Sequence, residues 1–208
     1  MRLALFPAWI GEEEESSMNL KEKEIQDIIL KTYHERGHYP ITLNFVGMGL
    51  GECDVISISS ANFSYEFEIK VSRSDFKADF KNKWGKHDRM SGNPGIRTYD
   101  KSTPKGKIKD YYKMYESCNY FFYVCPDGLI SAEEVPEYAG LIYVVEGRRE
   151  MELKEIKKAP LLHKEKADAA LIKQIGRNLT NKLFFGCSYT EYKFKSKYAE
   201  KLEGEVVQ

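Results

Sequence analysis

The chain has 208 residues, of which 42% are hydrophobic, enough for one domain with a buried core and short extensions. Its 32 Lys and Arg balance its 32 Asp and Glu, so the overall charge argues neither for nor against a nucleic-acid partner. The four cysteines show no CxxC pairing and no segment has the ~20 apolar residues of a membrane span, so we predict a cytoplasmic protein with reduced thiols and no membrane partner.

The first expected elements are an appendage and a helix. Residues 1–17 contain the acidic run Glu12–Glu15, in which like charges favour disorder, so they are predicted to be a flexible N-terminal appendage. Asn19 and Glu22 have the spacing of a capping box, which begins a helix running to about Tyr33. The buried stripe of this helix is expected to be Leu20, Ile25, Ile28 and Ile29.

Two histidines follow the first helix. His34 and His38 are four residues apart, a possible ligand spacing on one helix face, but Gly37 and Pro40 interrupt the helix between and after them. They are therefore interpreted as surface or turn histidines. Residues 41–46 are predicted to form a strand.

Two further strands are expected over residues 52–58 and 65–70, joined by a hairpin around Ser60–Ser64. Side chains two residues apart on a strand share a face. One face of the second strand carries Tyr65, Phe67 and Ile69. The other face carries Glu66, Glu68 and Lys70, with Asp54 of the preceding strand within reach.

An Asp beside a Glu-x-Lys strand suits a hard divalent cation. Mg²⁺ prefers oxygen ligands in an octahedron at about 2.0–2.1 Å and keeps several waters. Asp54, Glu68 and the backbone carbonyl of Ile69 would supply the protein ligands for Mg²⁺ or Mn²⁺, and Lys70 would position or activate an attacking water. On spacing alone the alternative is a surface hairpin with alternating charge, in which Glu68 and Lys70 form a pair worth under about 1 kcal/mol.

A second helix is expected from a Ser72 or Ser74 cap to about Lys83. Phe76 and Phe80, four residues apart, would face the core. Three basic residues near the charged strand are candidate contacts to a phosphate backbone, with a salt bridge as the alternative for the first: Arg73, Lys77 and Lys81.

The middle of the chain is basic. Residues 69–109 contain twelve Lys or Arg against four Asp. Residues 85–109 are rich in Gly, Pro and Lys and have no apolar period, so we predict a mobile basic loop beside the site. The alternative is a solvated loop that happens to hold many lysines.

The second half of the chain predicts three more strands and a helix. The strands are expected at Tyr120–Cys125, Gly140–Val145 and Met151–Lys157, and the helix at about Lys164–Leu183. Residues 184–208 are expected to be a C-terminal extension that contains both aromatic residues and lysines. The order of elements predicts an α/β fold with a mixed central β-sheet flanked by helices.

The charged hairpin carries a family resemblance. Asp54, thirteen intervening residues and then Glu68-Ile69-Lys70 resemble the signature of the PD-(D/E)xK nuclease superfamily, with Cys53 where that family has proline. The longer stretches at residues 68–80, 83–84, 118–126, 135–136 and 140–142 are similar to the MmcB-like branch of the superfamily, which is assigned to DNA repair. The resemblance covers about residues 20–160.

The resemblance implies a restriction-endonuclease-like domain over residues 18–183, a divalent metal and DNA as substrate. In the superfamily the first helix often sends a glutamate toward the metal; Glu24 is the candidate here and Glu22 the reserve, while an exposed helical glutamate is the alternative for either. Many relatives dimerise to cut two strands, so a homodimer is compatible with the resemblance, as is a repair-protein partner.

We therefore predict a metal-dependent DNA nuclease acting in DNA repair or processing, an endonuclease rather than an exonuclease. Its catalytic residues would be Asp54, Glu68, Lys70 and Glu24. The first alternative is a non-cleaving DNA-binding module on the same fold that recruits a repair partner. The second is an unrelated α/β protein whose hairpin carries these charges by chance.

Overall fold

The computed structural model describes residues 20–39, 41–46, 52–83, 86–87, 90–91 and 118–185. The predicted appendage, most of the predicted basic loop and nearly all of the C-terminal extension lie outside these residues. Within the described part of the chain, no helix combines the length and apolar character needed to cross a membrane.

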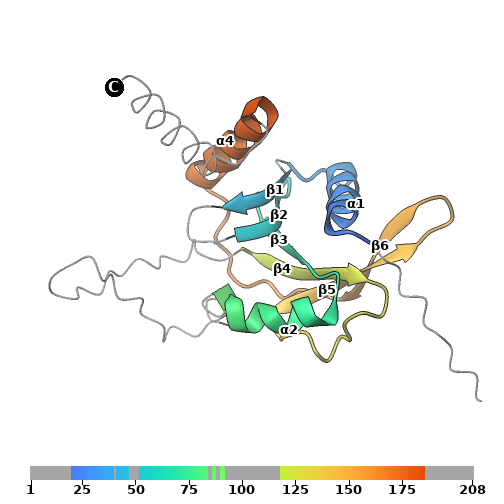
Figure 1. Cartoon of the computed structure of the whole chain (residues 1–208). Coiled ribbons are helices and arrows are strands. Elements are labelled where there is room, and N and C mark those ends of the chain that lie inside the picture. The colour runs from blue at the N-terminus through green and yellow to red at the C-terminus, as the bar shows by residue number, and fades with distance from the viewer. Residues whose placement is uncertain are drawn as a thin grey trace, which may run out of the picture.

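A six-stranded mixed sheet forms the centre of the domain (Figure 1). Its strands are β1 Ile41–Val46, β2 Glu52–Ile58, β3 Ser64–Ile69, β4 Tyr120–Pro126, β5 Ala139–Glu146 and β6 Met151–Lys157. They lie side by side in sequence order. The pairs β3–β4 and β4–β5 are parallel, and the other neighbouring pairs are antiparallel. The predicted α/β class and mixed sheet are confirmed.

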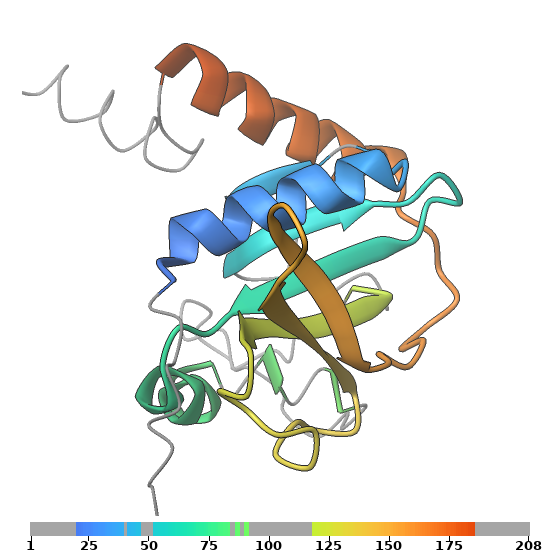
Figure 2. The same ribbon diagram turned by 90° about the vertical axis from the view of Figure 1, so that its right-hand side faces the viewer.

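In the described part of the chain, three long helices accompany the sheet. They are α1 Glu22–Glu35, α2 Arg73–Asn82 and α4 Ala169–Phe185. Figure 2 shows α1 lying across β1, β2 and β3, and Figure 1 shows α4 at the β1 edge of the sheet, which it contacts. The last helix begins about five residues later than predicted, because residues 158–168 form no regular secondary structure before it.

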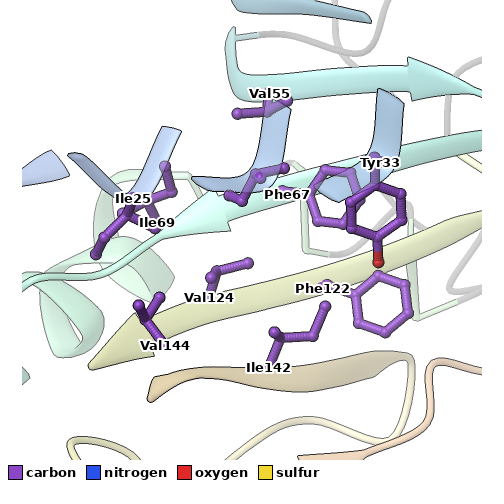
Figure 3. Packing of buried hydrophobic residues seen from close by; sticks show 10 residues of the cluster. Ile25, Tyr33, Val55, Phe67, Ile69, Phe122, Val124, Ile142 and Val144 are labelled. Atoms are coloured by element: carbon purple, nitrogen blue, oxygen red, sulfur yellow. The ribbon is translucent and has the colours of Figure 1, made fainter. Parts of the chain in front are cut away.

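The α1 face of the sheet is an apolar core (Figure 3). Ile25 and Ile29 of the predicted stripe are fully buried, and Phe67 stacks on Phe122 with ring centroids 5.8 Å apart. Burial of such side chains stabilises the fold by roughly 1.5–3 kcal/mol each. The alternation on β3 is as predicted, since Phe67 and Ile69 belong to this core.

A second apolar cluster lies on the other face, beneath α2. Ser72 caps this helix by accepting the backbone N–H of Asp75 at 3.2 Å, as one of the two predicted caps. Phe76 then packs edge-on against Tyr123 of β4, with ring centroids 5.1 Å apart. This packing holds α2 over the charged side of β3, which positions the site described below.

His38 is not the surface or turn residue predicted. It is buried, its Nδ1 lies 3.0 Å from Ser57 Oγ, and its ring meets those of Tyr33 and Tyr65 edge-on. Gly37 has φ +77°, which turns the chain back toward the sheet and inserts the ring. Burial, with a smaller effect from the Arg36 charge, lowers the pKa of His38 to about 4.

Candidate functional site

Eight ionisable side chains gather on the face of β2 and β3 that lies away from α1. We call this group the ion cluster. Its members are Asp54, Glu66, Glu68, Lys70, Asp79, Lys83, Lys86 and His87. They come from two strands, the end of β3, helix α2 and the segment just after it. Most of these side chains are nearly inaccessible to water, although a charged strand face is usually exposed.

Asp54 ties β2 to β3. The register pairs Val55 with Phe67, so one step further along Asp54 stands beside Glu68. The Asp54 Oδ2 atom accepts a hydrogen bond from the backbone N–H of Ile69 at 2.7 Å. Burial and then the charge of Glu68 raise the pKa of Asp54 to about 7, so its charge is costly in the absence of a cation.

Glu68 is the acceptor at the centre of the ion cluster. Its side chain is 1% exposed, and its carboxylate receives Lys70 at 3.0 Å, Lys86 at 2.9 Å, and Lys83. Burial disfavours the charged form, but the ammonium groups of Lys86, Lys70 and Lys83 outweigh burial and hold the pKa of Glu68 below its usual value. Glu68 is therefore kept as a carboxylate, the form in which it can bind a metal.

Lys70 sits between two buried carboxylates. Its Nζ donates to Glu68 Oε1 at 3.0 Å and to Asp79 Oδ1 at 2.9 Å. Burial opposes its charge, but Glu68 and Asp79 together raise the pKa of Lys70 above its ordinary value. The ammonium group thus has a fixed place beside the carboxylate pair.

Asp79 of α2 is held from three directions. Besides Lys70, its carboxylate accepts the Tyr123 hydroxyl at 3.1 Å and lies 2.8 Å from Nε2 of His87. His87 in turn has Nδ1 2.7 Å from the Tyr138 hydroxyl. Burial acts against ionisation, but the contacts from His87 and Lys70 hold the pKa of Asp79 well below its ordinary value.

Lys86 bridges the two glutamates of β3. It pairs with Glu66 and Glu68 and donates to the Glu52 carbonyl at 3.1 Å. Two buried thiols lie in the field of Glu66, those of Cys53 and Cys118, and burial raises the pKa of both well above the usual value. These cysteines are consistent with the reduced thiols predicted, and both are free.

The two candidate glutamates at the start of α1 make different interactions. Glu24 Oε2 accepts the backbone N–H of Lys21 at 2.7 Å, which caps the start of α1. Glu22 is the helical carboxylate whose charge contributes to the raised pKa of Asp54. The reserve candidate is therefore the one whose field reaches the site.

The basic residues of α2 are exposed. Arg73 pairs with Glu134 and donates to the Leu129 carbonyl at 2.9 Å, so the salt-bridge alternative is the one found. Lys77 and Lys81 lie on the solvent side of the same helix. None of the three belongs to the ion cluster, although all lie on the helix that carries Asp79.

The predicted metal ligands can be tested for fit. Within the described residues, no group of three or more His, Cys, Asp and Glu side chains is arranged to hold a metal ion. The predicted set is of another kind, two carboxylates and the Ile69 carbonyl. The raised pKa of Asp54 is the effect that a bound cation would reverse, so the donor set suits a hard divalent ion once an ammonium group leaves Glu68.

Sequence reasoning missed half of the ion cluster. Asp79 and Lys83 were not assigned roles, nothing selected His87, and Lys86 was overlooked. One local signal is present: Asp79 and Lys83 are four residues apart, which is the spacing of neighbours on one helix face. Glu66 falls on the charged face by strand alternation, whereas Lys86 carries no comparable signal.

Comparisons with known proteins place the fold only. No family model and no curated protein matches the chain. A solved structure of a protein of unknown function from Silicibacter pomeroyi superposes with a TM-score of 0.52 at 17% identity, over 80% of this chain and 91% of that one. At this identity the likeness extends to the fold and carries no activity.

Proposed function

We propose that this protein is a metal-dependent DNA nuclease with a restriction-endonuclease-like fold, acting in DNA repair or processing. The observation that supports the proposal best is the arrangement at the end of β2 and β3: Asp54 accepts the Ile69 backbone N–H and lies in the field of Glu68, and Glu68 accepts the Lys70 ammonium at 3.0 Å. These are the residues that the PD-(D/E)xK resemblance selects. A mixed sheet with β3 beside a parallel β4 is compatible with that fold.

Each residue of the site has a distinct task in this proposal. Asp54, Glu68 and the Ile69 carbonyl would hold Mg²⁺ or Mn²⁺, which when bound lowers the pKa of a water and stabilises charge on a phosphate. Lys70 orients the attacking water or donates to the phosphate, because its ammonium is held beside Glu68. Lys83, with 30% of its side chain exposed, is the ammonium best placed to leave Glu68.

The DNA backbone would run along the exposed side of α2. Lys77 and Lys81 face solvent there and are available to phosphates. Arg73 would exchange its Glu134 partner for a phosphate or keep that partner and stabilise the turn after β4. Cleavage at internal positions, and hence an endonuclease, remains the expectation from the resemblance.

The alternative is a DNA-binding module that recruits a repair partner and does not cut. One observation favours it: three ammonium groups already satisfy the Glu68 carboxylate. In that case the ion cluster is a structural network. A binder shows steep salt dependence and no metal-dependent product, whereas a nuclease gives product that chelation abolishes.

The experiment is a panel of labelled DNA forms incubated with the protein and Mn²⁺. Duplex, single-stranded and branched substrates are compared with and without a chelator. Asp54→Asn tests the site, and Asp27→Asn, at an exposed carboxylate of α1, is the matched control. Metal-dependent product from wild type and Asp27→Asn but not from Asp54→Asn supports the proposal; equal product from all three, or none from any, rejects it.

A further inference from the structure

Helix α2 carries a buried carboxylate for which the nuclease signature has no place. Asp79 is 1% exposed at its side chain, yet it lies nine residues beyond Lys70 and on a different element. A buried carboxylate usually has partners that compensate its desolvation. The partners of Asp79 include the one ammonium group that the proposed reaction uses.

We infer that Asp79 is a positioning residue of the proposed site, which fixes the Lys70 ammonium beside Glu68 through a chain of buried contacts anchored by Tyr123, His87 and Tyr138. The inference rests on the proposed nuclease function and deepens it. It adds a residue that acts through Lys70 and touches neither metal nor DNA.

The geometry of the chain supports this role. Lys70 follows directly after β3, and its backbone N–H still donates to the Val124 carbonyl of β4 at 2.9 Å, so the backbone is fixed and only the long side chain needs further partners. Glu68 Oε1 and Asp79 Oδ1 receive its Nζ at 3.0 and 2.9 Å. Two acceptors on different elements define the position of an ammonium group better than one.

Asp79 is itself held in place. Tyr123 donates to Oδ2 from β4, a strand buried within the sheet. His87 Nε2 lies 2.8 Å from Asp79 Oδ2 without the alignment of a hydrogen bond, and its Nδ1 lies 2.7 Å from the Tyr138 hydroxyl. Phe76 packs one turn earlier on the same helix, so the backbone of Asp79 is anchored as well.

The helix also supplies a matched control. Asp75 stands one turn before Asp79 on α2 and its carboxylate lies 3.9 Å from Lys70 Nζ, but 48% of its side chain is exposed. Solvent screens such a pair. Asp75→Asn therefore removes the same charge from the same helix without removing a buried contact.

The test combines two readouts. The first is steady-state cleavage of DNA with Mn²⁺ at a series of DNA concentrations, which gives kcat and KM separately. The second is acetylation of Lys70 by acetic anhydride, measured by mass spectrometry against exposed Lys77, which reports the position of Lys70 whether or not DNA is cut. Asp79→Asn is expected to lower kcat by about 10- to 100-fold with KM unchanged, and to increase Lys70 acetylation; Asp75→Asn changes neither.

A gentler variant protects the test against a folding defect. Tyr123→Phe keeps the ring that packs on Phe76 but deletes the hydroxyl that holds Asp79. It is expected to shift both readouts in the same direction by a smaller factor. If Asp79→Asn folds and its kcat and Lys70 acetylation equal those of wild type, the inference is overturned. If Asp79→Asn does not fold, the same result in Tyr123→Phe overturns it. Absence of cleavage by wild type overturns the proposed function, and acetylation then still decides whether Asp79 positions Lys70.

Discussion

The Asp54 carboxylate on β2 accepts the backbone N–H of Ile69 on β3 at 2.7 Å, although its pKa is raised to about 7. The bond favours the charged form, while burial and the Glu68 charge oppose it more strongly. Asp54 is therefore positioned to bind a cation, but its ionised carboxylate destabilises the metal-free fold. Both the stability of the protein and its metal affinity should depend on this charge.

Replacing Asp54 by Asn should stabilise the metal-free protein while abolishing metal-dependent cleavage. The amide oxygen can still accept the Ile69 N–H, and the buried charge is gone. Because the folded-state pKa of about 7 lies above the ordinary value of 3.8, the contribution of Asp54 to stability is lost as pH rises from about 4 to about 7. We expect Asp54→Asn to exceed wild type by about 1–2 kcal/mol at pH 8 and to match it below pH 4.

Urea unfolding of wild type and Asp54→Asn in the presence of a chelator, at pH 4 and pH 8, measures the difference between their free energies of unfolding. The other titrating groups are common to both proteins, so their contributions cancel in this difference. A variant less stable than wild type at pH 8 would show that the Asp54 charge is stabilising.

The affinity for Mn²⁺ should depend on pH through Asp54. A ligand must lose its proton before it binds a metal, and the pKa of Asp54 is about 7. Affinity should therefore rise up to about tenfold per pH unit below pH 7 and level off above it. Calorimetric titration with Mn²⁺ at pH 6, 7 and 8 gives the profile; an affinity constant over this range would contradict the assignment of Asp54 as a ligand.

The two lysines after α2 should behave differently when replaced by methionine. Lys86, 5% exposed, compensates both Glu66 and Glu68, so Lys86→Met should lower the free energy of unfolding by about 3–5 kcal/mol. Lys83 is partly exposed and shares Glu68 with two other ammonium groups, so Lys83→Met should cost under about 1 kcal/mol. It should also strengthen Mn²⁺ binding, because Lys83 competes with the metal for Glu68. Equal destabilisation by both, with no gain in affinity, would contradict this.

The predictable part of the molecule is the part that local pattern determines. Alternation on residues 65–70 and the continuous apolar run at 120–125 located β3 and β4, because a strand has a period of two and a strand buried on both faces is apolar throughout. The helix stripe at Ile25 and Ile29 followed from a period of 3.6 in the same way.

The ion cluster was less predictable because it is built by tertiary packing. Nothing near Glu68 in the sequence shows that α2 will cover it, or that Lys86, eighteen residues later, will reach it at 2.9 Å. His38 was misjudged for the same reason, since its partner Ser57 lies nineteen residues away. A charged strand face on its own predicts exposure to solvent. Burial of these side chains becomes possible only because oppositely charged residues from other elements pack against them.

Two glycines provide a test of the packing on the sheet. A Cβ on Gly140 of β5 would lie 2.5 Å from the Phe122 side chain and 2.7 Å from the backbone N of Ala159, so Gly140→Ala should destabilise by about 1–3 kcal/mol. Gly176 of α4 has nothing within 4 Å of that position, so Gly176→Ala should stabilise by about 0.5–1 kcal/mol. Thermal unfolding of both variants checks the pair, and a lower melting temperature for Gly176→Ala than for Gly140→Ala is the result not expected.

The exposed lysines of α2 should determine the salt dependence of DNA binding. Each phosphate contact contributes about 0.9 to the slope of log affinity against log salt. Lys77→Ala and Lys81→Ala should each reduce the slope by about 1, while Lys23→Ala, an exposed lysine of α1, should leave it unchanged. Fluorescence anisotropy across a salt series gives the slopes. Three identical slopes would contradict the proposal that DNA binds along α2.

The most direct test is a crystal soaked in Mn²⁺ and measured at the manganese absorption edge. We predict one anomalous peak bound by carboxylate oxygens of Asp54 and Glu68 and by the Ile69 carbonyl, at about 2.0–2.3 Å, with Lys83 displaced and Lys70 still on Asp79. No peak at this point under saturating Mn²⁺, with all three lysines still on Glu68, would contradict a cation site there and leave a structural ion network.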